Sequence, residues 1–195
     1  MPRLCSGPRP RLQAQTRSEI SLPRFLHRGG TGKLTLAAAL ASELGLRPGA
    51  CVLRGDITRR LLSGIARETK LPDDAYTRKT SRPVYDELGR KAAMGLKARY
   101  SVIIDAVALR QREWRSFAEV ALSASVPFSG LWLEAPAHTM AERVRRRRHD
   151  ASDATAEIVA EQARHDPRSI DWIRIDAGGQ SEDSLAAARR ALATS

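Results

Sequence analysis

Aromatic residues, cysteines and long apolar runs are all scarce in this chain of 195 residues. Its two cysteines, Cys5 and Cys51, fit neither a disulfide framework nor a metal site, which favours a reducing, cytoplasmic location. No apolar run approaches the roughly 18 residues of a membrane span, so we expect no membrane segment. The four histidines are scattered and none stands at metal-ligand spacing, so we expect no structural metal.

Acidic residues are also in deficit, and the formal net charge is +11. The basic residues concentrate in residues 1–30 and in the run from Arg143 to Arg148. Such clusters predict a partner rich in phosphate. Aromatic side chains, on which bound single strands of nucleic acid stack, make up only 5% of the chain and are nearly missing from the basic runs. A nucleotide is therefore the favoured partner, with a nucleic-acid-end kinase or a basic nucleic-acid binder as the alternative.

The most informative motif is an incomplete phosphate-binding loop at residues 28–35. An intact loop reads G-x-x-x-x-G-K-[ST]. Its glycines let successive backbone N–H groups face phosphate oxygens, and its lysine contacts the β- and γ-phosphates. The competing interpretation is a glycine-rich turn before an ordinary helix. We expect the nucleotide to be bound by Gly29, Gly30, Thr31, Gly32, Lys33, Leu34 and Thr35.

Two positions of this loop depart from the intact pattern. His27 stands where the first glycine belongs, and Leu34 stands where a hydroxyl normally binds Mg²⁺. Thr35 lies one residue further on, rotated by roughly 100° around the predicted helix, so we expect it on the surface or in packing. The strand that should lead into the loop contains Pro23 and Arg24, which are poor residues for a central strand.

Strands and helices alternate after Lys33. Such alternation predicts a parallel sheet covered by helices on both faces, with ligands at the carboxyl ends of the strands. Residues 1–24 lack periodicity, so we expect a disordered or atypical extension there and one domain over residues 25–195. Predicted strands cover residues 50–54, 100–105, 127–134 and 172–176. Predicted helices cover residues 34–44, 57–66, 84–98, 111–125, 153–164 and 182–193, and another starts at Pro136.

Taken together, several motifs resemble small P-loop kinases of the adenylate-kinase and gluconate-kinase type. The likeness is greatest to the ATP-binding, AAA-ATPase-type half of bacterial two-domain proteins whose other half is related to aminoglycoside phosphotransferases. It covers about residues 28–194, and residues 1–27 match nothing in it, so an upstream or out-of-frame origin for them is one hypothesis. It rests on residues 30–33, 53–56, 102–106, 130–136, 150–154 and 170–179.

The resemblance implies a P-loop NTPase fold, a three-layer sandwich around about five parallel strands, with an arginine-bearing lid. It implies ATP and Mg²⁺ as cofactors and transfer of the γ-phosphate to a small-molecule hydroxyl that it does not identify. It also implies a former fusion with a phosphotransferase-like domain. The departures at His27 and Leu34 support a second hypothesis, a degenerate nucleotide-binding module with little or no turnover.

The resemblance also suggests roles for individual residues. Asp56 would orient the acceptor hydroxyl or take its proton, and its alternative role is a helix cap. Asp105 would hold Mg²⁺ through water, with Asp56 as a second candidate, and its alternative role is a cap or a salt bridge. The lid would bring Arg143 and Arg147, four residues apart on one helical face, to the transferring phosphate, whereas the competing interpretation is a solvated basic face. Acceptor binding is expected from Arg59, Arg110 and Arg115, and the competing interpretation of Arg59 is a solvated surface arginine.

Overall fold

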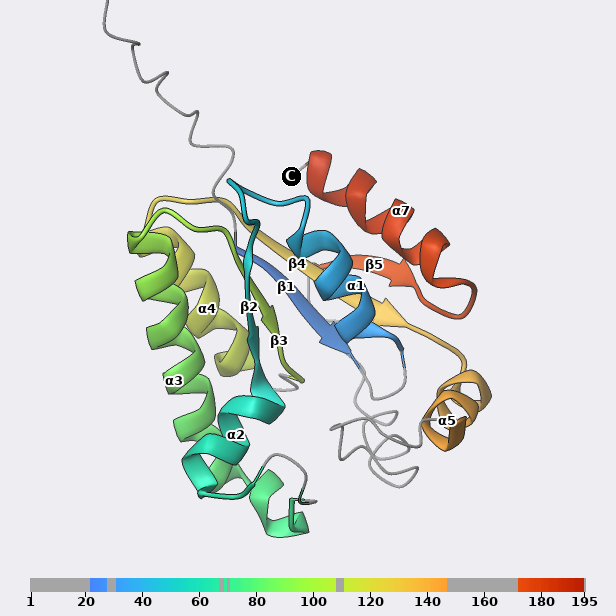
Figure 1. Ribbon diagram of the computed structural model, residues 1–195, viewed down its shortest axis with the longest axis horizontal. Helices are drawn as coiled ribbons and strands as arrows, with labels where there is room; N and C mark the ends of the chain where they lie inside the picture. Colours follow the sequence, from blue (N-terminus) through green and yellow to red (C-terminus); the bar gives the residue numbers. More distant parts are fainter. Residues whose placement is uncertain are drawn as a thin grey trace, which may run out of the picture.

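A central parallel sheet with helices on both sides organises the chain (Figure 1). The computed structural model describes residues 22–27, 31–66, 69, 71–107, 111–146 and 172–194. The strands are β1 (Leu22–His27), β2 (Cys51–Arg54), β3 (Val102–Asp105), β4 (Phe128–Glu134) and β5 (Ile173–Asp176). The helices are α1 (Lys33–Ala41), α2 (Gly55–Ser63), α3 (Arg78–Lys97), α4 (Gln111–Ser123), α5 (Ala137–Arg146) and α7 (Ser181–Ala193), with a 3-10 turn η2 (Asp73–Tyr76).

The strand order is β2-β3-β1-β4-β5, and every pairing is parallel. β1 therefore occupies the centre of the sheet, between β3 and β4. Because all strands run the same way, their carboxyl ends meet at one edge, where α/β proteins bind their ligands. The prediction of a parallel sheet of about five strands is confirmed.

Two buried clusters hold the layers together. On one face, α3 and α4 cover the sheet through Leu88, Phe117 and Trp132, all of them buried. On the other face, α1 and α7 pack through Leu40 and Ala188, which are 1% and 0% exposed. Since parallel strands are buried on both faces, β3 is apolar along its whole length apart from its final aspartate. The predicted three-layer sandwich is therefore confirmed.

The strand that leads into the loop is present as β1, although it contains Pro23 and Arg24. All six residues of β1 are in register with β4, from Leu22 opposite Phe128 to His27 opposite Leu133. Its register with β3 begins only at Arg24, one residue after Pro23, so the missing N–H of the proline falls outside that ladder. The strand thus begins three residues before the domain boundary expected from composition.

Helix α3 starts well before its predicted first residue. The sequence predicts a helix from residue 84 with Pro83 in its first turn, but the helix begins at Arg78 and contains Pro83. Thr77 provides the start, because its side chain accepts a hydrogen bond from the backbone N–H of Thr80 at 3.4 Å. The predicted helix over residues 153–164 lies outside the described residues. In the part of the chain that the structure describes, no helix is long and apolar enough to span a membrane.

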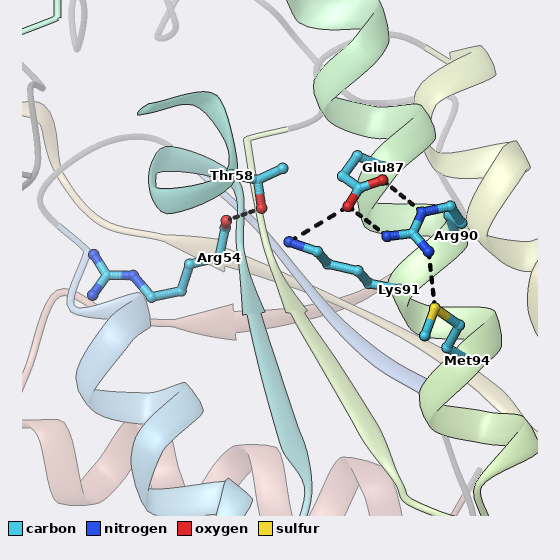
Figure 2. Close-up of polar contacts among 6 residues, drawn as sticks. All are labelled: Arg54, Thr58, Glu87, Arg90, Lys91 and Met94. Carbon is cyan, nitrogen blue, oxygen red and sulfur yellow. Dashed lines mark hydrogen bonds and ion pairs between the residues drawn. The ribbon is translucent and has the colours of Figure 1, made fainter. Parts of the chain in front are cut away.

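Helix α3 carries a compact charge cluster on its surface (Figure 2). The guanidinium of Arg90 donates two hydrogen bonds to the carboxylate of Glu87, at 2.7 and 2.8 Å, and Lys91 lies 3.6 Å from the same carboxylate. Arg90 also donates to the sulfur of Met94 at 2.9 Å. The hydrogen bonds from Arg90, helped by the charges of Arg90 and Lys91, lower the pKa of Glu87 to about 2.

We expect this cluster to make stability depend on pH in the acid range. The pKa of Glu87 rises from about 2 in the folded chain to an ordinary value near 4.5 on unfolding. The stabilisation is therefore complete above about pH 4.5 and is lost as the pH falls toward 2. Glu87→Gln should lower the urea midpoint at pH 7 and make its decrease between pH 5 and pH 3 smaller. Glu119→Gln on α4, where the described residues offer no ion-pair partner, is the control, and equal pH profiles for the two variants would contradict the prediction.

Candidate nucleotide site

The described part of the predicted loop, residues 31–35, lies at the carboxyl edge of the sheet. β1 ends at His27 and α1 begins at Lys33, so the loop joins the central strand to a helix on one face. Gly29 and Gly30 lie outside the described residues, and their predicted contacts stay predictions. Thr31, at the end of the loop, is 4% exposed.

The start of α1 has the geometry of an anion-binding helix terminus. Gly32 precedes the helix with φ +83°, a left-handed conformation that favours glycine, and a Cβ at this position would meet nothing within 4 Å. Among the described residues no side chain caps the helix, and its first turn contains no acidic residue. The N–H groups of the first turn and the positive end of the helix dipole are therefore available to a phosphate. Lys33 forms no ion pair with a carboxylate of the described residues.

A pocket of about 410 Å³ opens beside this terminus. It contacts Thr31 and Gly32 and runs along α1 to the loop between β5 and α7. Its apolar walls are formed by Leu36, Ala39, Leu133, Ala177 and Leu185. Its polar groups come from Thr35, Arg143, Gln180, Ser181, Glu182 and Ser184. A pocket with apolar walls, a few polar groups and this volume suits a nucleoside whose phosphates lie at the start of α1.

The two residues after Lys33 differ in position. Thr35 is exposed on the surface of the helix, as expected, and it also lines the pocket, while its predicted contact with the nucleotide stays a prediction. Leu34 is half-buried and does not line the pocket. Its side chain has no oxygen, so the usual hydroxyl ligand for Mg²⁺ is missing, as the sequence indicates.

Arg143 lies in the wall of the pocket. Its guanidinium donates hydrogen bonds to the carbonyl oxygens of Ala177, Gly178 and Gly179, at 2.5, 3.4 and 2.6 Å. These contacts tie α5 to the β5–α7 loop. The predicted role of Arg143 at the transferring phosphate stays a prediction, and its guanidinium is held here by backbone carbonyls. Arg147, its predicted partner, lies outside the described residues.

Asp56 follows β2 and is paired with an arginine that the sequence analysis did not single out. Arg54 donates to both carboxylate oxygens, at 3.1 and 2.5 Å, and the N–H of Ile57 donates to Oδ1 at 2.8 Å. The Oγ1 of Thr58 donates to the carbonyl of Arg54 at 2.9 Å and steadies the start of α2 (Figure 2). Helix α2 begins at Gly55 with Arg54 at its N-cap position and no side-chain cap hydrogen bond, so the alternative role of Asp56 as the helix cap is wrong. A role at the acceptor would require Asp56 to exchange its bond with Arg54.

Asp105 ends the buried strand β3 and is 3% exposed. It stands in register with Phe25 of β1 and with Arg54 of β2, so it lies next to the strand that enters the loop. One carboxylate cannot hold Mg²⁺ alone, and the described residues contain no group of three potential metal ligands. The predicted role of Asp105 behind a metal-bound water therefore stays a prediction.

The remaining residues that we expected to bind the acceptor differ in burial and in contacts. Arg59 is 7% exposed, donates to the carbonyl of Ala75 at 2.5 Å and lies 4.9 Å from the ring centre of Tyr76. It therefore joins α2 to η2, a contact that its predicted role does not include. Arg115 is exposed on α4, 5.7 Å from the ring centre of Trp114. Arg110 lies outside the described residues, so these acceptor contacts stay predictions.

The polar end of the pocket was not predicted from the sequence. Gln180, Ser181 and Glu182 lie before and within the first turn of α7, next to the ligand space. The pair of glycines at 178–179 was the available signal, because turns at a carboxyl sheet edge often border ligands.

Comparison with known proteins shows the family of this chain. A family model described as an AAA domain matches residues 28–167. The uncharacterized protein Rv2004c of Mycobacterium tuberculosis is 36% identical over 166 residues, which are 80% of this chain and 31% of that protein. A Mycobacterium bovis relative, the uncharacterized protein Mb2027c, matches equally well. The chain therefore spans about a third of the length of the curated relatives it matches.

Solved structures of small-molecule kinases share the fold. A gluconokinase from Sinorhizobium meliloti 1021 has a TM-score of 0.64 at 20% identity, covering 91% of this chain and 94% of its own. A sugar kinase from Janibacter sp. HTCC2649 reaches a TM-score of 0.68 at 20% identity, with 89% and 95% covered. The Mycobacterium tuberculosis APS kinase CysC, solved with AMPPNP and APS, reaches 0.66 at 18% identity, with 91% and 99% covered.

These identities show the fold alone, whereas the family model covers well over half of the chain. The chain therefore belongs to the AAA domain family and has the P-loop fold of small-molecule kinases.

Proposed function

We propose that this protein binds ATP and transfers its γ-phosphate to the hydroxyl group of a small molecule. One observation carries the proposal: the uncapped start of α1, with Gly32 in a left-handed conformation and Lys33 beside it, opens directly onto a pocket of nucleoside size. A helix terminus alone attracts many anions. A terminus that continues into an apolar pocket favours an anion with an attached base.

The described residues suggest how the nucleotide would be held. Backbone N–H groups at the start of α1 and the ammonium of Lys33 would hold the phosphates. The base would lie between α1 and α7, against Leu36 and Leu185, where its flat surface replaces water. Bound ATP with Mg²⁺ supplies the phosphoryl group to be transferred and neutralises part of its charge.

The acceptor would lie on the other side of α1, near the ends of β2 and β3. The Arg54–Asp56 pair stands there, half-buried, with α2 after it. A carboxylate in this position orients a hydroxyl for attack and takes its proton as the bond to phosphorus forms. Arg54 holds that carboxylate in place until the acceptor binds.

The test is a calorimetric titration with ATP, with and without Mg²⁺, followed by turnover with a panel of sugars, sugar acids and nucleosides. We expect micromolar to millimolar ATP binding and phosphorylation of at least one compound. Failure to bind ATP under either condition would overturn the proposal. Tight, strongly salt-dependent binding of oligonucleotides with no nucleotide binding would favour the nucleic-acid alternative.

A second candidate is a nucleotide-binding module without turnover, and Leu34 favours it. A loop without its hydroxyl can still bind phosphates through backbone N–H groups but has lost a direct metal ligand. This candidate predicts ATP binding that does not depend on Mg²⁺ and no phosphorylation of any compound in the panel.

Restoring the hydroxyl should strengthen metal-dependent binding. We expect Leu34→Ser to raise ATP affinity by about tenfold in the presence of Mg²⁺ and to leave it unchanged in EDTA, because the new oxygen can coordinate the metal. Leu34→Ala, which removes the same apolar side chain without adding an oxygen, is the matched control. Equal affinities for the serine and alanine variants in Mg²⁺ would show that the missing hydroxyl is not the limiting defect.

A further inference from the structure

We propose that Met94 is a modification site, at which a peroxide converts the thioether to a sulfoxide and Arg90 holds the new oxygen atom. The site lies on the surface of α3, and α3 contributes no residue to the described nucleotide pocket. The proposal therefore goes beyond the proposed function and does not depend on it. The reactant is a two-electron oxidant of the peroxide class, and no nucleotide takes part.

The first observation is the difference in exposure between two methionines of the described residues. Met94 is 58% exposed, whereas Met140 on α5 is 0% exposed. A peroxide in solution therefore reaches the Met94 sulfur in the folded chain, but reaches the Met140 sulfur only when the structure opens locally. The solvated surface of α3 also accommodates a polar product, whereas a sulfoxide at Met140 would stand in the core.

The second observation is the hydrogen-bond donor beside the Met94 sulfur. Nη1 of Arg90 donates to this sulfur at 2.9 Å, while Nε and Nη2 of the same guanidinium donate to Glu87 at 2.7 and 2.8 Å (Figure 2). Arg90 and Met94 are four residues apart, so they share one face of α3. Because the two bonds to Glu87 fix the planar guanidinium, Nη1 is kept directed at position 94.

The oxidation step balances with hydrogen peroxide as the only other reactant. The sulfur attacks one peroxide oxygen with a lone pair, the O–O bond breaks, and hydroxide leaves. The leaving hydroxide takes the proton from the oxygen now bonded to sulfur, so the products are the sulfoxide and water. The sulfur loses two electrons and the peroxide gains them.

Arg90 favours the product more than the reactant. A thioether sulfur is a weak acceptor, whereas the sulfoxide oxygen carries partial negative charge and accepts from a cationic donor more strongly. Nη1 can therefore donate to the new oxygen in place of the sulfur. The hydrogen bonds to Glu87 persist, because they use other N–H groups of the guanidinium.

A simpler explanation of an exposed methionine needs no reaction product. Methionine is a good helix former, and single exposed apolar residues are normal on protein surfaces. This explanation also allows Met94 to be oxidised, but it gives Arg90 no influence on the oxidised state. The contribution of Arg90 therefore distinguishes the two explanations.

The first experiment treats the full chain, isotope-labelled at its methionine methyl groups, with hydrogen peroxide and follows each methyl signal by NMR. The chain has three methionines, and Met94→Leu identifies the signal of position 94. We expect Met94 to be oxidised faster than Met140 by about tenfold or more, because only Met94 is accessible in the folded chain. Equal rates at the two positions would overturn the proposal.

The second experiment is a double-mutant cycle on the donor. Urea unfolding is measured for the parent and for Arg90→Ala, each before and after oxidation of Met94. Relative to Arg90→Ala, oxidation of the parent should favour the folded state by an additional factor of about three to ten in the unfolding equilibrium constant. The loss of the bond to Glu87 is common to both oxidation states and cancels in the cycle.

The matched control is Arg82→Ala, which removes another exposed arginine of α3 that lies 3.8 Å from a carboxylate, that of Asp86. It stands three turns before Met94, so it should not change the effect of oxidation. Equal effects of oxidation in the parent and in Arg90→Ala would show that Arg90 does not hold the sulfoxide oxygen and would overturn its assigned role. The comparison of oxidation rates uses the unaltered side chains at both positions, so it tests the site even if Arg90→Ala does not fold.

Discussion

Lys33→Ala is expected to weaken ATP binding by about 10- to 100-fold, because hydrogen bonds between a charged donor and a charged acceptor contribute about 1.5–3 kcal/mol each. AMP should bind the variant and the parent equally, since in the proposed arrangement the base and ribose would contact the pocket between α1 and α7 and not the lysine. The measurement is a pair of titrations, ATP and AMP, for each protein. A loss of affinity for ATP but not for AMP would show that Lys33 contacts the β- and γ-phosphates.

The control for this prediction is Lys79→Ala, which removes an exposed lysine from the first turn of α3. It lowers the net charge by the same amount and lies away from α1, so ATP affinity should not change. Equal losses in the two variants would indicate a general effect of charge. Unchanged ATP affinity in Lys33→Ala would falsify the assignment of residues 28–35 as a phosphate loop.

The largest expected effect on stability comes from Gly130→Ala in β4. A Cβ on this buried glycine would stand 2.4–2.6 Å from three atoms of the Trp172 ring, closer than any real contact. The ring has little room to move, since it packs edge-on against both Trp114 and Phe128, with centroids 6.1 and 6.4 Å away. Overpacking of this kind costs about 3 kcal/mol, and the melting temperature should fall by about 6–12 °C.

A second glycine supplies the matched control. Gly89 lies inside α3, and a Cβ there would meet its nearest atoms at 3.8–4.0 Å, an ordinary contact. Gly89→Ala should leave the melting temperature unchanged or raise it slightly, because alanine gains about 0.5–1 kcal/mol over glycine within a helix. A melting temperature for Gly130→Ala as high as that of Gly89→Ala would contradict the packing around Trp172.

The sequence predicted the order and type of the elements after Lys33 well, because their apolar periodicity is regular. The predicted strand over residues 172–176 and the predicted helix over residues 182–193 each start one residue from the observed β5 and α7. The carboxyl edge was predicted by the same reasoning, since parallel strands bring their ends together. That rule placed four predicted site residues at this edge of the sheet: Gly32, Lys33, Asp56 and Asp105.

What sequence reasoning could not supply are contacts between residues far apart in the chain. Nothing near residue 143 indicates that its side chain reaches carbonyls at 177–179, because that contact depends on how α5 packs. The hydrogen bond from Arg59 to the carbonyl of Ala75 was also unpredictable, because it depends on how α2 packs against η2. The start of α3 was misjudged for a local reason: Pro83 is typical of a first turn, whereas the cap at Thr77 places it inside the helix.

The central position of β1 has a consequence for the newborn chain on the ribosome. β1 is made first, yet its neighbours β3 and β4 end at residues 105 and 134, so the strand waits several seconds at about 5–20 residues per second. An apolar strand with free edges would invite aggregation during that interval. Pro23 and Arg24, which are unfavourable in a finished central strand, belong to the residue types that oppose such aggregation.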